Sequence, residues 1–465
     1  MSRPLAALIA VLLVMALLPA ASVSAADSTQ IDSATIENGY PTQLKFKLTA
    51  HASSDITDVA LSYSIAGRGT SALAKPASLL PAKQLSTEVI LQVNSGSSYI
   101  PVGSDFVYHW EITTADGSTF KAPDASFLYL PPDEQWQSVK GDFMTVYYHG
   151  SNQELANAYL KAGVETFGKM STQLLKTTLK QTPVNVILFD NERESDPARP
   201  GGGSGKFDQA VTTCGTKVTN DIILIIPVSC GTPDKTDTLR HEFTHIITDS
   251  AGNGPLSQLP AWLDEGTAVN GQLTPGNNFT GAFDSAVRSN KLLAFSSIAV
   301  EPSNANLVNL FYGQSYMMAK YLIGKGPDKY AQLFATIQKG NRIDDALKQV
   351  YGFDLAGFEA EFRQANGLQP LPQATASPTP ASRATATSGN SGASSAGGGI
   401  GTTTVVLGGG ALFVLLAIFS VLVSMMLSNN RKQALRTQRL AEPPAQLLEP
   451  LGASEWPPDG PPTQD

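Results

Sequence analysis

Two apolar runs separate the part of this chain that can fold in water from the parts that cannot. The first run, residues 5–18, follows Met1 and Arg3 and leads into small residues that end at Ala25. This three-part pattern is typical of a secretory signal peptide, so we expect removal of residues 1–25. The second run, residues 405–427, carries no charge and can cross the roughly 30 Å of a bilayer core as a helix.

The charges beside the second run indicate its orientation. Four basic residues follow it closely, whereas no charge precedes it back to Arg383: Arg431, Lys432, Arg436 and Arg439. Because basic flanks stay in the cytoplasm, we expect a transmembrane helix at 404–428, a cytoplasmic tail at 429–465 and everything before the helix outside. The sequence thus predicts a single-pass protein of the cell membrane with an extracytoplasmic N-terminal ectodomain, and this architecture suggests a bacterial cell surface.

Composition separates a stalk from the folded part and excludes one class of partner. Residues 368–403 are mostly Pro, Ala, Ser, Thr and Gly, which cannot bury enough apolar surface to fold, so we expect a disordered stalk. The chain has 32 basic and 40 acidic residues and a pI near 5.2. Nucleic acid is therefore not an expected partner, because phosphate binding needs clustered Lys and Arg. The oligomeric state stays open.

The two cysteines, Cys214 and Cys230, both lie in the part expected outside the cell. An oxidising compartment allows a disulfide between them to persist. Two buried free thiols are the alternative. Neither the number nor the spacing of the cysteines indicates a zinc–cysteine site.

Residues 27–131 show short runs in which apolar and polar residues alternate. Period-two runs separated by turn residues indicate antiparallel strands. We expect strands at five positions: 43–48, 59–65, 88–93, 106–113 and 126–130. About a hundred residues of this kind predict an immunoglobulin-like β-sandwich. Trp110 is expected in its core, although a carbohydrate-binding surface is an alternative for such aromatics.

Residues 140–367 follow a different pattern that mixes strands with long helices. We expect strands at 143–148, 184–189 and 221–226, a helix at 152–179, a surface loop at 190–207 and a helical region from 235 to 362. The chain is therefore predicted to be multidomain, with an all-β domain followed by an α+β domain whose C-terminal half is mainly helical.

One helix in this second domain carries a metal-binding pattern. His241 and His245 are four residues apart, so they project from neighbouring turns on one side and can reach a single Zn²⁺. Glu242, next in sequence, is placed to act on the water that zinc activates. Leu239, Phe243, Ile246 and Ile247 form a separate apolar stripe that we expect to be buried. An incidental pair of helical histidines is the alternative.

A catalytic zinc has three protein ligands and one open position, so a third ligand must come from elsewhere. The segment 260–266 has Pro260 at a helix start and presents Glu265 nineteen residues beyond His245. H-E-x-x-H followed at this distance by W-L-x-E-G-x-A resembles the gluzincin peptidases, which include thermolysin-like and aminopeptidase-N-like enzymes, and most closely the peptidase MA-like domains. The resemblance covers about 146–363 and implies a zincin-like fold with Glu265 as the third zinc ligand. A solvent-facing helical glutamate is the alternative.

A third segment also resembles these enzymes. Residues 311–316 open a helix and are similar to the stretch in which aminopeptidase-N-like enzymes carry a tyrosine that stabilises the transition state. Tyr312 matches that position, and Tyr316, one turn later, is an alternative oxyanion donor. Either tyrosine could be an ordinary core residue. The G-x-M-E-N segment with which aminopeptidases recognise a free N-terminus does not occur in the sequence, so exopeptidase activity is not implied.

These features predict a zinc-dependent peptidase at the outer cell surface that acts on peptide or protein substrates. Glu242 is the expected general base, and Tyr312 assists the oxyanion. The strand at 221–226, or the Gly-rich loop with Cys214, is a candidate for pairing with an extended substrate. The alternative is a surface-anchored binding or adhesion protein whose zincin-like domain is inactive.

Overall fold

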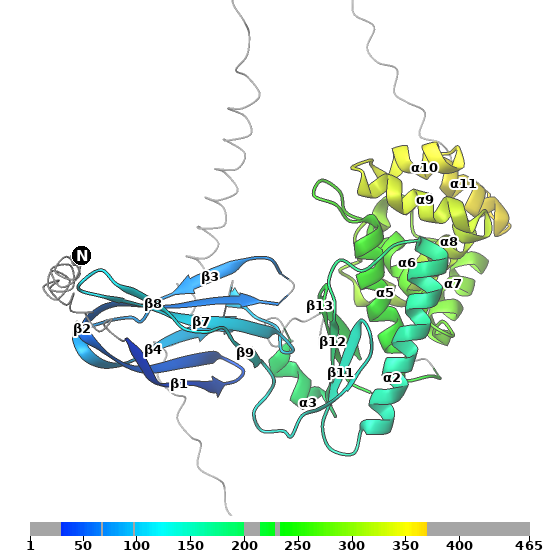
Figure 1. Cartoon of the computed structure of the whole chain (residues 1–465). Coiled ribbons are helices and arrows are strands. Elements are labelled where there is room, and N and C mark those ends of the chain that lie inside the picture. The colour runs from blue at the N-terminus through cyan, green and yellow to red at the C-terminus, as the bar shows by residue number, and fades with distance from the viewer. Residues whose placement is uncertain (1–28, 67, 96–97, 200–213, 228–232, 370–465) are drawn as a thin grey trace, which may run out of the picture. The chain divides into compact units, whose positions relative to one another are not determined.

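The computed structural model describes residues 29–66, 68–95, 98–199, 214–227 and 233–369 (Figure 1). The predicted signal peptide, transmembrane helix and cytoplasmic tail lie outside the described residues, as do Cys230 and nearly all of the predicted stalk. Within the described ranges, no helix combines the length and the apolar character that a membrane crossing requires. All described residues belong to one compact unit of the chain.

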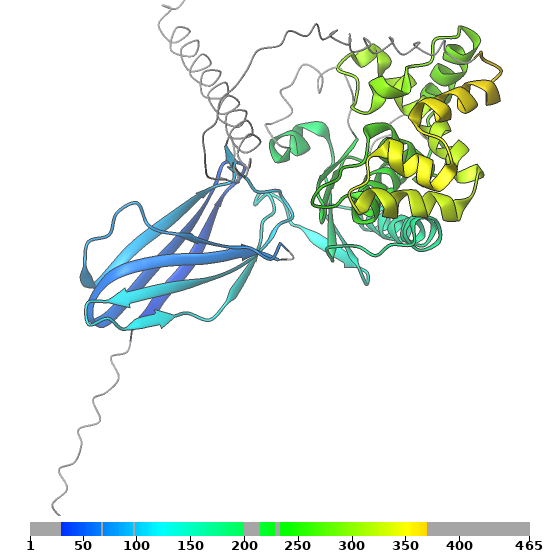
Figure 2. The ribbon, with the colours of Figure 1, turned by 90° about the horizontal axis from the view of Figure 1, so that it is seen from above.

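The N-terminal part is a sheet of seven antiparallel strands, visible in Figure 2. Its strands are β1 (Gln30–Gly39), β2 (Gln43–Ile65), β3 (Ser71–Ala74), β4 (Ala82–Gln92), β7 (Asp105–Thr114), β8 (Thr119–Lys121) and β9 (Ala125–Leu128), with a small separate hairpin of β5 (Asn94–Ser95) and β6 (Ser98–Tyr99). Side chains alternate across a strand, and in β2 Leu44, Phe46 and Leu48 are buried while their neighbours are more exposed. Trp110 is 2% exposed, so its predicted place in the core is confirmed.

The sheet differs from the predicted sandwich in its connectivity. β2 runs unbroken for 23 residues, where the sequence predicted two strands. Its first part pairs with β1 and β4 and its second part with β3 and β7, with a register shift between His51 and Ile56. β1, β3, β4 and β7 are therefore joined through β2, and β8 and β9 extend the same sheet by pairing with β7. The sequence pattern could not distinguish one long strand from two short ones. The polar residues at 53–55 would suit a turn between two strands as well as the exposed middle of one strand.

A second sheet of five strands begins the α/β part. Its strands are β10 (Gln137–Lys140), β11 (Met144–Tyr148), β12 (Val184–Leu188), β14 (Ile222–Ile225) and β13 (Gly215–Thr219), in that order across the sheet. The inner three are parallel and the two edge strands antiparallel. In β12, Val186 packs in the core beneath the helices, whereas Ile187 packs in the core of the N-terminal sheet. Burial on both faces explains why this strand is a continuous apolar run.

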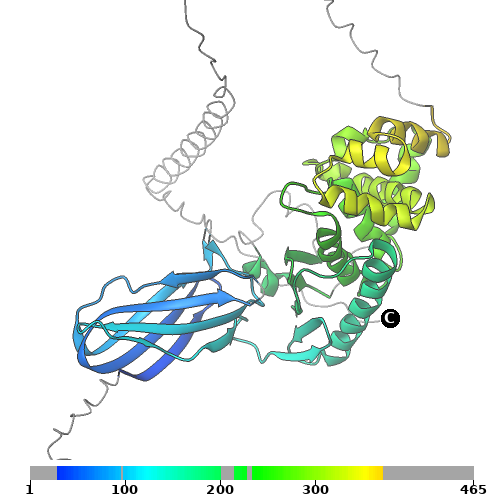
Figure 3. The same cartoon turned by 45° about the horizontal axis from the view of Figure 1, so that its top comes forward.

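Helices complete the α/β part, as Figures 1 and 3 show. They are α2 (Gln153–Thr166), continued by the π-helix η1 (Phe167–Leu175), α3 (Glu192–Ser195), η2 (Asp196–Ala198), α5 (Asp237–Gly252), α6 (Ala261–Gly271), α7 (Asn277–Arg288), η4 (Phe295–Ile298), η5 (Ala305–Leu307), α8 (Val308–Gly324), α9 (Pro327–Gln338), α10 (Ile343–Tyr351) and α11 (Leu355–Ala365). The predicted β-sheet region followed by a helical C-terminal half is confirmed. The predicted loop at 190–207 is wrong in its first part, where the Asn191 side chain accepts a hydrogen bond from the Glu194 N–H and caps α3.

Close packing of three helices positions the candidate site. A Cβ atom on Gly266 of α6 would overlap the backbone carbonyl of Ser315 on α8. A Cβ on Gly271 would overlap the Thr244 hydroxyl on α5 in the same way. These two glycines therefore let α6 lie directly against both neighbouring helices, which explains the glycine that follows Glu265 in the sequence.

Candidate metal centre

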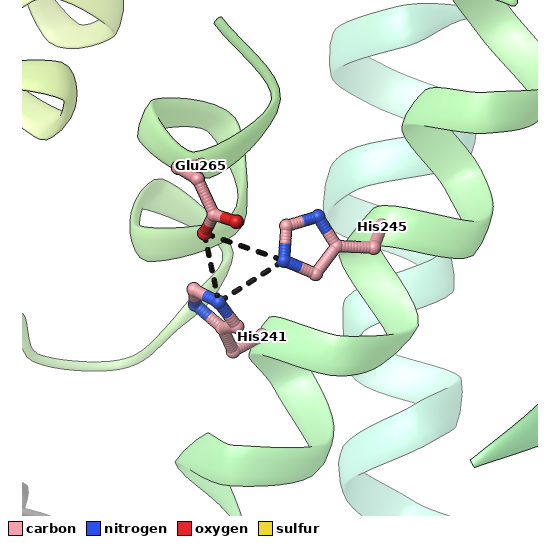
Figure 4. Close-up of side chains that lie close together, drawn as sticks. All are labelled: His241, His245 and Glu265. Carbon is pink, nitrogen blue, oxygen red and sulfur yellow. Dashed lines mark hydrogen bonds and ion pairs between the residues drawn. The ribbon is translucent and has the colours of Figure 1, made fainter. Parts of the chain in front are cut away.

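The two histidines lie on α5, on the side away from its buried stripe. Leu239, Phe243, Ile246 and Ile247 are all 0% exposed, as the helical spacing predicted. His241 and His245 instead face α6, which carries Glu265 (Figure 4). All three side chains are largely buried, with 13%, 11% and 9% of their surfaces exposed. The structure thus brings together the three residues that the sequence predicted as metal ligands.

The three donor atoms form a tight triangle. Glu265 Oε2 lies 3.2 Å from His241 Nε2 and 3.4 Å from His245 Nε2. The two nitrogens are 3.1 Å apart. Ligand atoms at about 2.0–2.1 Å from a tetrahedral zinc lie roughly 3.3–3.4 Å from one another. Two imidazoles and one carboxylate at these separations therefore match the donor set and the size of a zinc site.

Electrostatics in this cluster favour a bound cation. Burial opposes protonation of His245, but the carboxylates of Asp264 and Glu265 outweigh it and raise the pKa of His245 well above its ordinary value. Burial acts against ionisation of Glu265, while His245 and His241 lower its pKa far below the ordinary range. The cluster therefore holds a carboxylate that needs positive charge beside it, which either a proton on His245 or a metal ion can supply.

Asp264 orients one ligand from behind, a role that the sequence did not indicate. Its Oδ1 lies 3.1 Å from His245 Nδ1, the ring nitrogen that faces away from Glu265. The Thr248 hydroxyl donates a hydrogen bond to the same oxygen. A carboxylate on the far nitrogen fixes the tautomer and the orientation of a metal-binding imidazole. The only feature of the sequence that pointed to Asp264 was its position directly before Glu265.

The two candidate tyrosines lie in different places. The Tyr312 ring is 6.0 Å from the His241 ring and stacks on Phe279 at 5.1 Å. Burial and the nearby carboxylates of Glu265, Glu301 and Glu242 raise the pKa of Tyr312 well above its ordinary value, so its hydroxyl remains a proton donor. Tyr316 instead lines a cavity of about 450 Å³ that lies apart from the metal ligands.

The separate cavity around Tyr316 includes none of the three metal donors. It is lined by residues of η1, α6 and α8 that include Lys169, Asn270 and Ile323. The Tyr316 hydroxyl accepts a hydrogen bond from Lys320 at 3.4 Å, on the surface of α8. Of the two tyrosines, Tyr312 is therefore the one that the structure places beside the metal ligands.

Glu242 faces an edge strand of the five-stranded sheet. The Lys217 backbone N–H of β13 donates a hydrogen bond of 2.8 Å to Glu242 Oε2. Gly215 makes this approach possible, because a Cβ there would meet Thr238 and Glu242. The expectation that 221–226 offers a free edge is wrong, because β14 is paired on both sides, and β13 is the edge strand. Cys214, directly before β13, is buried and disulfide-bonded, while Cys230 lies outside the described residues, so their pairing stays a prediction.

A further carboxyl group near the metal ligands belongs to Glu301, which the sequence did not single out. Its loop is fixed to the start of α6, where the Ala261 N–H donates a 2.9 Å hydrogen bond to the Ala299 carbonyl. Burial and the Glu265 carboxylate raise the pKa of Glu301 to about 7. No periodicity marks this residue, because it lies in an irregular segment between η4 and η5.

Comparison with known families agrees with the geometry. The sequence model of the Peptidase MA superfamily matches residues 172–366. This part of the chain is a peptidase MA-like domain, as the motifs predicted, and membership points to a peptidase. The match includes all three donor residues and Tyr312, and it covers less than half of the 465 residues. No curated protein is significantly similar to the chain.

Similarity to solved structures is weak. The bromine derivative of BhCBM56 shares 10% identity with a TM-score of 0.15, over 20% of this chain and 88% of that chain. The β-glucuronidase of Parabacteroides merdae shares 11% identity with a TM-score of 0.17, over 47% of this chain and 27% of that chain. Scores this low carry no information about function.

Proposed function

We propose that the peptidase MA-like domain hydrolyses peptide bonds with a zinc ion held by His241, His245 and Glu265. The observation that carries the proposal is the triangle of donor atoms, 3.1–3.4 Å apart, formed by two helices. Only three protein donors converge there among the described residues, which leaves a coordination position for water or substrate. Catalytic zinc sites have this arrangement, whereas structural zinc sites are closed by a fourth protein ligand.

The roles of the surrounding residues follow from their positions. Zinc, when bound, supplies a Lewis acid that polarises the scissile carbonyl and makes water acidic enough to act as a nucleophile near neutral pH. Glu242 accepts a proton from the attacking water and passes it to the leaving amine. The Lys217 N–H holds the Glu242 carboxylate in place at 2.8 Å. Asp264 keeps the His245 ring oriented toward the metal.

The open edge of β13 is the surface on which we place the substrate. The Lys217 N–H points away from β14, since it donates to Glu242, so this side of the strand is not used by the sheet. An extended peptide bound here by strand addition would run beside Glu242. Substrate recognition through backbone hydrogen bonds would leave specificity to pockets that accept alternate side chains.

The location of the domain is a separate part of the proposal. We place it at the outer face of a cell membrane, anchored by a helix at 404–428. This rests on the sequence pattern at 1–25 and 404–428, which lie outside the described residues.

Metal removal and peptide cleavage test the function. We expect the purified full-length chain to cleave members of a peptide library, to lose this activity after dialysis against a chelator, and to regain it on addition of one equivalent of zinc. Mass spectrometry of the new peptide ends measures each state. Equal cleavage before and after complete metal removal would contradict zinc-dependent hydrolysis.

Tyr312→Phe is expected to lower kcat by about 10- to 10³-fold with little change in KM, because the phenol donates to charge that appears only in the transition state. Tyr316→Phe is the matched control, one turn further along α8 and in a different cavity, and should retain full activity. Initial rates over a range of substrate concentrations measure both parameters. Equal rates for the two variants would remove Tyr312 from the mechanism.

A further inference from the structure

A second group of potential ligands lies apart from the first site. His149, Asp190 and Glu194 each offer one donor atom, and these atoms lie within 4.8 Å of one another. His149 directly follows β11, and Asp190 follows β12 by two residues. Because β11 and β12 are adjacent and parallel, their carboxyl ends meet at one edge of the sheet. Glu194 reaches this edge from α3.

The central contact of this group is short and buried. His149 Nε2 lies 2.8 Å from Glu194 Oε1, and His149 is 5% exposed. Neither of these two buried atoms has a hydrogen-bond partner among the described residues, so they face each other without hydrogen-bond alignment. His51 and His109 behave differently, because both are hydrogen-bonded to their carboxylate neighbours. The His149 ring is thus aimed at a position between donor atoms.

The remaining contacts hold the donors in place. The Glu134 carboxylate lies 3.4 Å from His149 Nδ1, on the far side of the ring, as Asp264 does for His245. The Trp136 ring packs edge-on against the imidazole at 4.9 Å. Glu194 Oε2 accepts a 2.9 Å hydrogen bond from the Asp190 N–H, which leaves Oε1 facing His149. A carboxylate behind a histidine is the usual support of a metal-binding imidazole.

The charge of the group calls for a cation. Glu134, Asp190 and Glu194 surround one histidine, and within the described ranges none of them forms an ion pair with Lys or Arg. Asp190 Oδ1 accepts a hydrogen bond of 2.7 Å from the neutral Asn152 side chain. Three carboxylates around one imidazole leave a net negative charge, which a divalent ion bound beside His149 and Glu194 would offset.

We propose that His149, Asp190 and Glu194 form a second metal site that takes a divalent transition ion of the zinc class. An imidazole ligand favours zinc over calcium or magnesium, which prefer oxygen donors only. Asp190 is exposed, so water completes the coordination there. The ion ties α3 to the ends of β11 and β12, about forty residues apart in the chain, and its role is to stabilise this junction.

Zinc stoichiometry tests this site independently of catalysis. The full-length chain is expected to bind two equivalents of zinc in a calorimetric titration. His245→Ala should leave one equivalent, and the addition of His149→Ala to that variant should leave none. His109→Ala is the matched control, because His109 also lies between two carboxylates but is hydrogen-bonded to both of them, and it should not change the stoichiometry.

Failure of this inference and failure of the proposed function give different results. One equivalent that is lost in His245→Ala but kept in His149→Ala would overturn the second site. One equivalent that is lost in His149→Ala but kept in His245→Ala would support the second site and contradict the first. Glu194→Gln, which keeps the size of the side chain, should weaken zinc binding at least about tenfold while circular dichroism remains unchanged. Unchanged affinity in Glu194→Gln would also overturn the proposal.

Discussion

Glu242→Gln is expected to lower kcat for peptide hydrolysis by about 10²- to 10⁴-fold, the usual contribution of a general base. A glutamine cannot accept the proton from water at this position. Its amide oxygen can still accept the 2.8 Å hydrogen bond from the Lys217 N–H, so the local structure should persist. Because Glu242 is not one of the three donors, the variant should also bind zinc as tightly as the unaltered chain. Steady-state cleavage of a fluorogenic peptide and zinc titration measure the two properties.

The comparison needs a control for the charge that is removed. Glu165→Gln removes a carboxylate from the same domain, one that pairs with Arg240 at 2.7 Å and is not a metal donor, so its kcat should stay within about twofold. Cleavage by Glu242→Gln at the rate of this control would show that Glu242 is not the general base. Loss of zinc in Glu242→Gln would instead place Glu242 among the ligands.

His245→Ala is expected to abolish zinc binding at the first site and, with it, peptide hydrolysis. The substitution leaves two donors, His241 and Glu265, and removes the cation that neutralises the buried Glu265 carboxylate in the metal-free chain. We expect zinc affinity at this site to fall by more than about 10²-fold, because loss of a supporting residue alone costs 10- to 100-fold. Competition with a fluorescent zinc chelator measures the affinity.

Asp264→Asn provides the graded comparison for His245→Ala. The amide can still contact His245 Nδ1 but lacks the charge that raises ligand basicity, so zinc affinity should fall by about 10- to 100-fold. His51→Ala, a surface histidine paired with Asp32 at 2.8 Å, should leave the affinity unchanged. Equal zinc affinity in His245→Ala and His51→Ala would refute the ligand assignment.

The parts of the site that the sequence predicted are those fixed by a single helix. Four-residue spacing places His241 and His245 on neighbouring turns whatever the rest of the fold does. The buried stripe of α5 follows from the same period and is confirmed at each of its four positions. Glu265 lies on a second helix, so helical spacing alone could not place it beside the histidines. Its assignment as the third ligand came from the resemblance between motifs.

The parts that the sequence could not predict depend on contacts between distant segments. Lys217 approaches Glu242 only because β13 is the edge of the sheet, and edge position is set by pairing with β14 rather than by local pattern. Glu301 reaches Glu265 from an irregular segment that carries no period. His149 and Glu194 meet because β11 and β12 are parallel neighbours, a pairing that the sequence alone does not specify.

The same reasoning explains the misjudged strands. The strand at 221–226 was a candidate for pairing with a substrate, but β14 has no free edge because it pairs with β12 and β13. Its apolar character results from burial of one face in the core beneath the helices and of the other in the core of the N-terminal sheet. The edge strand β13 contains Thr and Lys and has no strong alternation, so no strand was expected there. The apolar strand β14 therefore has no free edge to which a substrate could be added, whereas the more polar β13 has one.

Anomalous diffraction at the zinc absorption edge, from crystals of the zinc-loaded full-length chain, tests the central claim most directly. We predict a peak about 2.0–2.1 Å from His241 Nε2, His245 Nε2 and a Glu265 carboxylate oxygen, with the remaining position held by water. The absence of a peak among these three residues, or a fourth protein ligand that closes the site, would contradict a catalytic zinc centre.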